Sequence, residues 1–345
     1  MAKCLVTGAS GFIGTHLVRA LVERGDEVSC LVRRTSKLVN LNGLPVQLVQ
    51  GDITDVASLA PAVGNCDVVY HLAGLTKALS MADMMRANAE GIQNVMQAAA
   101  ALPQPPVVIY VSSLAAAGPS ADSRPREPND LPRPVSNYGR SKLMGEIAAA
   151  GYADRVPLTI LRPPIVIGEA DLLALDLFFN VHAFNIHLVP GWKPVRFSMV
   201  HARDLAESLI LAAERGKRVQ RDAFQVEKGQ VVAMNGQGIY YPSDPSMPTF
   251  AEYGQLIARG FGRKRVFCLH TPRAAAWLLA AISELFGKVV GKPMVLNLDK
   301  VREAVAGNWI CSPQSAQTEL GFRPAAPLAS RIEQTAQWYV QEGWV

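Results

Sequence analysis

The chain is poor in the residues that would build a disulfide framework or a metal site. Its five cysteines are odd in number and form no C-x-x-C pair: Cys4, Cys30, Cys66, Cys268 and Cys311. This pattern predicts free thiols in a reducing compartment, with those of Cys4 and Cys30 buried in strands. None of the six histidines has the spacing of metal ligands, so we expect no bound metal. No secretory signal precedes the first strand-like segment, and we expect a cytoplasmic location.

Dense charge and long apolar runs are also missing. The net charge is +5, but Lys and Arg are spread along the chain without a basic block, so we expect no nucleic acid partner. The apolar run 274–282 has nine residues, well short of the roughly 20 that span a bilayer. We expect no transmembrane segment and interpret this run as a buried helix. Peripheral contact with a membrane surface, or with an apolar substrate, is the alternative.

Strand-like and helix-like segments alternate through the first half of the chain. The strand-like runs are Cys4–Thr7, Glu27–Val32, Val46–Val49, Val68–Leu72, Val107–Ser112 and Leu158–Leu161. The helix-like segments are Gly14–Arg24, Val56–Val63, Met84–Leu102 and Tyr138–Gly151. This order predicts an α/β fold, a Rossmann-like doubly wound parallel sheet.

The second half breaks this rhythm and predicts a smaller, mostly C-terminal substrate domain. We assign residues 1–168 to a cofactor-binding domain, with part of 193–235 returning to it. Residues 169–192 and 236–345 then form the substrate-binding part. The proline-rich stretch Pro119–Pro134 is expected to be a loop.

A glycine-rich turn connects the first strand to the first helix. The segment Thr7–Gly14 reads T-G-A-S-G-F-I-G, with G-x-x-G-x-x-G spacing. Free backbone N–H groups and the helix dipole make such a turn an anion site, and bare glycines let a pyrophosphate approach the backbone. The expected cofactor-binding residues here are Gly8, Ser10, Gly11, Phe12, Ile13 and Gly14.

Tyr138 and Lys142 are four residues apart and share a helix face. A cation beside the phenol should lower the pKa of Tyr138 toward working pH and make it a proton donor or acceptor at a carbonyl carbon. Ser112-Ser113 closes the expected fifth strand, at the sheet edge where open α/β folds bind ligands. We expect Tyr138, Lys142 and one of these serines to be catalytic, and the family resemblance given below implies that the serine is Ser113.

The cofactor type is predicted from the end of the second strand. An acidic residue there would bind a ribose 2′-hydroxyl, but this chain has Arg33 and Arg34. Guanidinium groups suit a phosphate, which favours NADP(H) over NAD(H).

Together these motifs resemble the extended branch of the short-chain dehydrogenase/reductase superfamily. Gly51-Asp52-Ile53, His71-Leu72-Ala73-Gly74, Asn88-Ala-Glu-Gly91 and Leu161-Arg162-Pro163 extend the resemblance over about residues 3–215. The resemblance implies that Asp52 and Ile53 flank the adenine, and that Leu72, Ala73, Gly74 and Pro163 line the cofactor groove with Tyr138 and Lys142. Asn88 matches a common family position, for which a structural role in the helix is an equal alternative.

Within that superfamily the chain looks most like the 3β-hydroxysteroid dehydrogenase and dihydroflavonol reductase-like branch. No acidic residue follows Ser113, and Ile165 stands where sugar-nucleotide enzymes usually have Asn. We expect an NADP(H)-dependent oxidoreductase that interconverts a ketone and a secondary alcohol on an apolar, steroid-like or polyketide-like substrate. Aromatic residues near 178–192 and the helix of Trp277 are expected at its pocket. The alternatives are a nucleotide-sugar epimerase and a non-catalytic NADP-binding protein.

The resemblance also suggests a homodimer. Extended members often pair the helix after strand four with the helix that carries the Tyr-x-x-x-Lys motif, here Met84–Leu102 and Tyr138–Gly151. Both are rich in alanine, at 98–101 and 148–150, which permits close helix approach.

Overall fold

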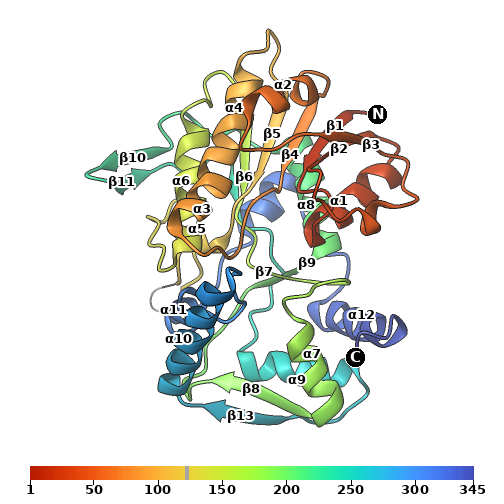
Figure 1. Cartoon of the computed structure of the whole chain (residues 1–345), viewed down its shortest axis with the longest axis vertical. Coiled ribbons are helices and arrows are strands. Elements are labelled where there is room, and N and C mark those ends of the chain that lie inside the picture. The colour runs from red at the N-terminus through yellow and green to blue at the C-terminus, as the bar shows by residue number, and fades with distance from the viewer. Residues whose placement is uncertain (121–123) are drawn as a thin grey trace.

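A seven-stranded parallel sheet forms the centre of the computed structural model, which describes residues 1–120 and 124–345 (Figure 1). The strand order is β12-β6-β5-β4-β1-β2-β3, so the chain winds outward from β1 in both directions. The bounds are β1 Lys3–Thr7, β2 Glu27–Val32, β3 Gln47–Gln50, β4 Val68–His71, β5 Val107–Val111, β6 Leu158–Leu161 and β12 Ile239–Tyr240. The predicted Rossmann-like fold is confirmed.

Helices cover both faces of this sheet. On one face α1 (Phe12–Glu23) packs beside α8 (Ala202–Arg215), and both contribute leucines to a fully buried core with β1 and β2. On the other face lie α2 (Val56–Val63), α4 (Gly91–Ala100) and α6 (Asn137–Ala150), packed over β4, β5 and β6. The apolar periodicity that predicted these helices therefore corresponds to the sides they bury against the sheet.

The predicted helix Met84–Leu102 is divided in the structure. It consists of α3 (Met81–Met85), a π-helical turn η2 (Arg86–Glu90) and α4. Asn88 lies in the π turn, buried, and its amide is fully used: Oδ1 accepts from the Leu75 N–H, while Nδ2 donates to the Leu75 carbonyl and to Ser141 Oγ. These contacts give Asn88 a structural role in the helix, which is one of the two alternatives that the sequence analysis left open.

Much of the second half of the chain forms the end of the molecule farthest from α2, while α8, β12 and residues 224–234 lie with the sheet (Figure 1). Its helices are α7 Leu175–Phe184, α9 Phe250–Gly260, α10 Arg273–Val290, α11 Leu298–Val305 and α12 Leu328–Gln341, and η3 Ala316–Leu320 packs on α8. Four-residue α5 (Leu114–Ala117) follows β5, and the 3-10 turn η1 (Val39–Leu41) follows β2.

Three short strand pairs have no counterpart in the sequence-based prediction. They are the parallel pairs β7 (Ile165–Ile167) with β9 (Met199–His201) and β8 (Ile186–Pro190) with β13 (Phe267–Thr271), and the hairpin β10 (Phe224–Glu227) with β11 (Gln230–Met234). The seventh sheet strand, β12, comes from the part assigned to the substrate domain. The division at residue 168 stays a prediction.

Other expectations have mixed outcomes. Cys4 and Cys30 are buried free thiols, as predicted. Residues 121–123 of the expected Pro119–Pro134 loop lie outside the described residues.

In the described part of the chain, no helix is long and apolar enough to cross a membrane. The interpretation of 274–282 as a buried helix is wrong, because α10 exposes its apolar side to solvent.

The alanines that suggested a homodimer are largely used inside the subunit. Ala98, Ala99, Ala149 and Ala150 are all buried within the single chain, where α4 packs on α6 and α2. They are therefore not free to contact a second copy. The homodimer stays a prediction, without this support.

Candidate active site

The glycine-rich turn has the geometry of a dinucleotide cradle. Gly8 has φ +73°, and a Cβ built on it would lie 2.7 Å from the Ala73 backbone nitrogen. A Cβ on Gly14 would lie 2.1 Å from the Gly8 carbonyl oxygen, so only glycine lets α1 start against this turn. Gly11 is the N-cap of α1 and has no side chain to occupy the N–H groups that follow. These residues fit a pyrophosphate at the positive end of α1.

The other expected cofactor residues lie at the carboxyl ends of the neighbouring strands. Arg33 and Arg34 directly follow β2 and are exposed, with the Arg33 N–H donating to Ser36 Oγ. Asp52 follows β3, where its Oδ1 accepts from the backbone N–H and the hydroxyl of Thr54.

A cavity of about 540 Å³ brings most of the expected site residues together. Its lining includes Gly8, Gly11, Phe12, Ile13, Gly14, Leu72, Gly74, Ser113, Tyr138, Lys142 and Pro163. Ser10, Arg33, Arg34, Asp52, Ile53 and Ala73 are not part of the lining. The cavity therefore joins the glycine turn to the three residues expected to be catalytic.

The structure distinguishes the two serines that follow β5. Ser112 also lines the cavity, but it is buried and its hydroxyl donates to the Glu146 carboxylate. Ser113 lines the cavity, caps α5 by accepting from the Ala115 N–H at 3.1 Å, and is hydrogen-bonded to Tyr138, which lowers the pKa of the phenol. Ser113 is thus the serine that lies beside the expected proton donor.

Lys142 is buried beneath the cavity. Its Nζ donates to the Val111 carbonyl at 2.7 Å and lies 4.5 Å above the centre of the Tyr110 ring. Burial lowers the pKa of Lys142 to about 7, against the opposing effect of the Glu146 carboxylate.

The expectation that Lys142 lowers the pKa of Tyr138 is not met. Burial raises the pKa of Tyr138 above its ordinary value, and the largest opposing effect comes from Lys300. The Lys300 ammonium lies 5.2 Å from the centre of the Tyr138 ring. The helix-face argument placed Lys142 correctly on the side of Tyr138, but its ammonium is held by the Val111 carbonyl.

Lys300 reaches the site because α11 is anchored on the start of α6. The Asp299 carboxylate accepts from the backbone N–H groups of Asn137, at 2.7 Å, and Tyr138, at 3.1 Å. Ser136, the N-cap of α6, donates to Glu303 at 2.6 Å, and Glu303 in turn pairs with Lys300 at 2.8 Å. No spacing rule relates residues this far apart, so nothing in the sequence singled out Lys300.

A buried ion pair fixes the opposite side of α6. Arg162, at the end of β6, donates to both Glu146 oxygens at 2.9 and 2.6 Å, and to the Tyr241 hydroxyl at 2.9 Å. Both charged side chains are fully buried. This contact ties α6 to β6 and to the strand β12 beside it.

The cavity walls away from the glycine turn are mainly apolar. A second cavity of about 290 Å³ adjoins the first at Ser113 and Tyr138. The apolar side chains lining the two include Leu114, Ile165, Leu173, Leu177, Phe197, Phe250 and Trp309. The aromatic residues expected at the pocket are elsewhere: Phe178 is in a core cluster, and Phe179 and Trp192 are exposed.

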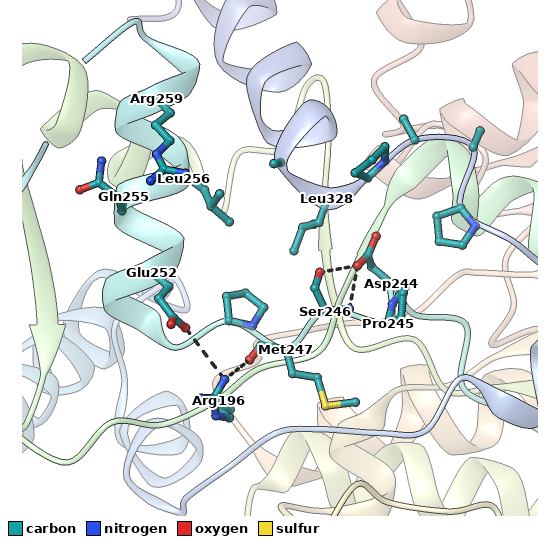
Figure 2. Close-up of a pocket in the computed structure, with 16 residues that line it drawn as sticks. Arg196, Asp244, Pro245, Ser246, Met247, Glu252, Gln255, Leu256, Arg259 and Leu328 are labelled. Carbon is teal, nitrogen blue, oxygen red and sulfur yellow. Dashed lines mark hydrogen bonds and ion pairs between the residues drawn. The ribbon is translucent and has the colours of Figure 1, made fainter. Parts of the chain in front are cut away.

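A wider groove of about 820 Å³ lies between α9 and the start of α12 (Figure 2). Three of its charged groups already have partners: Arg196 donates to the Met247 carbonyl at 2.9 Å and lies 4.0 Å from Glu252, and Asp244 accepts from Ser246. None of the glycine turn, Ser113, Tyr138 or Lys142 lines it. Despite its size, this groove has no group placed for the chemistry described above.

Comparison with known proteins identifies the family. A model of the NAD dependent epimerase/dehydratase family matches residues 4–226, which hold the glycine turn, Ser113, Tyr138 and Lys142. The chain belongs to this family. It is an enzyme of the NAD(P)-dependent oxidoreductase type, as the sequence analysis predicted.

The relatives include a reductase, a dehydrogenase and an epimerase. The chain is 29% identical to a ceramide reductase of Caulobacter vibrioides over 99% of this chain and 95% of the relative. It is 27% identical to the 3 beta-hydroxysteroid dehydrogenase type 7 of Mus musculus, over 97% and 94% of the two chains. It is equally similar, at 27%, to a UDP-glucuronate 4-epimerase of Arabidopsis thaliana, over 97% of this chain and 76% of the relative.

Solved structures share the fold at lower identity. The dTDP-glucose 4,6-dehydratase of Streptomyces venezuelae, solved with NAD bound, has a TM-score of 0.75 and is 21% identical over 99% and 98% of the two chains. The UDP-glucuronic acid 4-epimerase of Bacillus cereus, also solved with NAD, has a TM-score of 0.74 at 18% identity over 99% of both chains.

Proposed function

We propose that the enzyme interconverts a ketone and a secondary alcohol on an apolar substrate, with NADP(H) as cofactor. The observation that carries the proposal is the pair of hydroxyls, Ser113 and Tyr138, at the junction of the glycine-turn cavity and an apolar cavity. The bound cofactor would supply or accept the hydride. Gly8, Gly11 and Gly14 would hold its pyrophosphate, and Pro163 and Leu72 would line its path.

In this proposal each catalytic side chain has one task. Ser113 donates a hydrogen bond to the substrate oxygen and orients it beside Tyr138. Tyr138 donates its proton to that oxygen in reduction and removes it in oxidation. Lys142 lines the cavity, where it can donate a hydrogen bond to the ribose of the cofactor, and burial lowers its pKa to about 7.

Three features support an apolar substrate over a nucleotide sugar. Ile165 lines both cavities, and no acidic residue follows Ser113, where Leu114 instead lines the apolar cavity. Among the relatives are a ceramide reductase and a hydroxysteroid dehydrogenase. Burial of apolar ligand surface against these walls would provide the binding free energy.

A substrate panel tests this proposal directly. Purified enzyme with NADPH is offered long-chain and steroid ketones, and separately UDP- and dTDP-sugars, while oxidation of NADPH and formation of sugar isomers are followed. We expect turnover of apolar ketones alone. Epimer formation from a UDP-sugar, without net NADPH oxidation, would replace this proposal by the epimerase alternative.

The cofactor preference gives a second test. Arg33 and Arg34 are exposed at the end of β2 with no acidic residue beside them in the chain, so NADPH should bind more tightly than NADH. Arg33→Asp should reduce or invert the ratio of the two dissociation constants, measured by fluorescence titration. Arg221→Asp, at an exposed arginine on another surface, is the control and should leave the ratio unchanged. Equal affinities in the parent enzyme would contradict the preference.

The position of Lys300 predicts a shift in the pH profile. Its ammonium favours the Tyr138 phenolate, so Lys300→Gln should raise the pKa of Tyr138. In alcohol oxidation Tyr138 must accept a proton, so the pH of half-maximal kcat should move upward. Lys300→Arg keeps the charge and should restore the parent profile. A Lys300→Gln profile that coincides with the parent would show that Lys300 does not act on the phenol.

A further inference from the structure

Helix α10 exposes a continuous apolar stripe to solvent. Leu278, Leu279, Ile282, Leu285, Phe286, Val289 and Val290 recur at helical spacing, and each is between 50% and 81% exposed. Soluble proteins rarely expose contiguous apolar patches of this kind without a binding partner. We call these seven residues the α10 stripe.

The other side of α10 packs against the protein, and this packing fixes the outward direction of the stripe. The buried positions are the small residues Ala280 and Gly287, which allow close packing against the neighbouring chain. Glu284 faces the same way: it pairs with Lys288 at 3.2 Å and accepts from the Leu298 N–H that begins α11 at 3.2 Å. The helix is thus anchored through its small and polar side, the reverse of a helix that covers a core.

Exposed apolar residues continue onto the strand pair next to α10. β13 ends at Thr271, two residues before α10 begins, and it exposes Phe267 and Leu269. Its partner β8 exposes Leu188, and Trp192 follows β8. α10 and the β8–β13 pair lie together at the end of the molecule opposite α2 (Figure 1).

The chain segment that forms most of this surface carries mainly positive charge. Residues 263–296 contain one carboxylate, Glu284, which is already paired, and six cations: Arg263, Lys264, Arg265, Arg273, Lys288 and Lys292. Exposed Lys264 and Arg265 precede β13, and exposed Lys288 and Lys292 flank the end of the α10 stripe. An apolar stripe flanked by cations matches the interface of an anionic membrane, where acyl chains lie beneath negative headgroups.

We propose that the α10 stripe and its flanking cations dock this enzyme on the surface of an anionic lipid bilayer. The helix lies in the interface with its apolar side among the acyl chains, and the chain does not cross the membrane. A second copy of the chain fits this surface poorly, because a two-fold contact would bring the same cations face to face.

Vesicle flotation of the full-length enzyme tests the proposal. The parent should float with vesicles of phosphatidylcholine and phosphatidylglycerol at 3:1, and much less with phosphatidylcholine alone. Val289→Glu and Leu285→Glu, made separately, should each lower the partition coefficient at least about tenfold, because each places a charge among the acyl chains. Lys264→Gln with Arg265→Gln should lower it roughly twentyfold on the anionic vesicles only.

Matched controls separate docking from unfolding and from self-association. Val39→Glu, at a comparably exposed valine on η1, and Lys228→Gln, in the β10–β11 turn, should float like the parent. All variants should keep the parent melting temperature. The proposal would be overturned if the parent enzyme stayed with the unbound fraction, or if Val289→Glu and Leu285→Glu left the partition coefficient unchanged. It would also be overturned if light scattering showed a lipid-free dimer that Val289→Glu converts to a 37.2 kDa species.

Discussion

Replacing Tyr138 by phenylalanine should lower kcat by about 10²–10⁴-fold, the usual contribution of one general acid–base group. The substitution removes only the hydroxyl that is hydrogen-bonded to Ser113 at the junction of the two cavities. The ring keeps its place under Lys300, since α6 is held by Ser136, Asp299 and the Glu146–Arg162 pair. The loss should therefore appear in kcat, measured with the ketone that the substrate panel identifies.

Binding of NADPH gives the readout that separates catalysis from damage to the fold. Its dissociation constant in Tyr138→Phe should stay within a few-fold of the parent, because the glycine turn is unaffected. Tyr152→Phe, just beyond the end of α6, is the matched control and should keep parent kinetics. Turnover of Tyr138→Phe close to that of the parent would mean that another group transfers the proton, and the proposed roles would be wrong.

Arg162→Met should destabilise the enzyme by about 3–5 kcal/mol, the cost of leaving one member of a buried pair without its partner. Methionine fills similar space but donates no hydrogen bond, so the Glu146 carboxylate would remain fully buried with only Ser112 as a donor. The Tyr241 hydroxyl would also lose its guanidinium partner. The urea midpoint of unfolding measures the loss.

An exposed ion pair serves as the control for the buried pair. Arg221 lies 2.8 Å from Asp154, but both side chains are more than half exposed, at 68% and 53%. Arg221→Met should change the free energy of unfolding by no more than about 1 kcal/mol, because solvent screens such pairs. Equal urea midpoints for the Arg162 and Arg221 variants would show that the buried pair adds no stability.

Several parts of the site were predictable because their signals are local. The glycine spacing of Thr7–Gly14 reflects contacts between residues a few positions apart, such as that of Gly14 with the Gly8 carbonyl. The strands next to this turn alternate with helices whose apolar spacing directly encodes which side packs on the sheet. The position of Ser112-Ser113 follows from this framework, because the carboxyl ends of parallel strands meet at one edge. Tyr138 was predicted from its four-residue spacing to Lys142, and the choice of Ser113 came from the family resemblance.

Other parts depend on contacts between distant segments, which no local pattern encodes. Lys300 lies over Tyr138 because α11 caps the start of α6 through Asp299, and the apolar cavity walls come from segments as far apart as Leu114 and Trp309. The expected lowering of the Tyr138 pKa by Lys142 failed for the same reason. The Lys142 ammonium donates to the carbonyl of Val111, which lies on a distant segment.

Helix α10 is the clearest case in which the local sequence did not determine the tertiary arrangement. Its sequence predicted an apolar helix at 274–282, since helical propensity and spacing are properties of neighbouring residues. Which side of this helix packs on the protein depends on the segments that the rest of the chain places beside it. Only the tertiary structure decided it: Glu284, Ala280 and Gly287 pack inward beside α11, and the stripe faces outward.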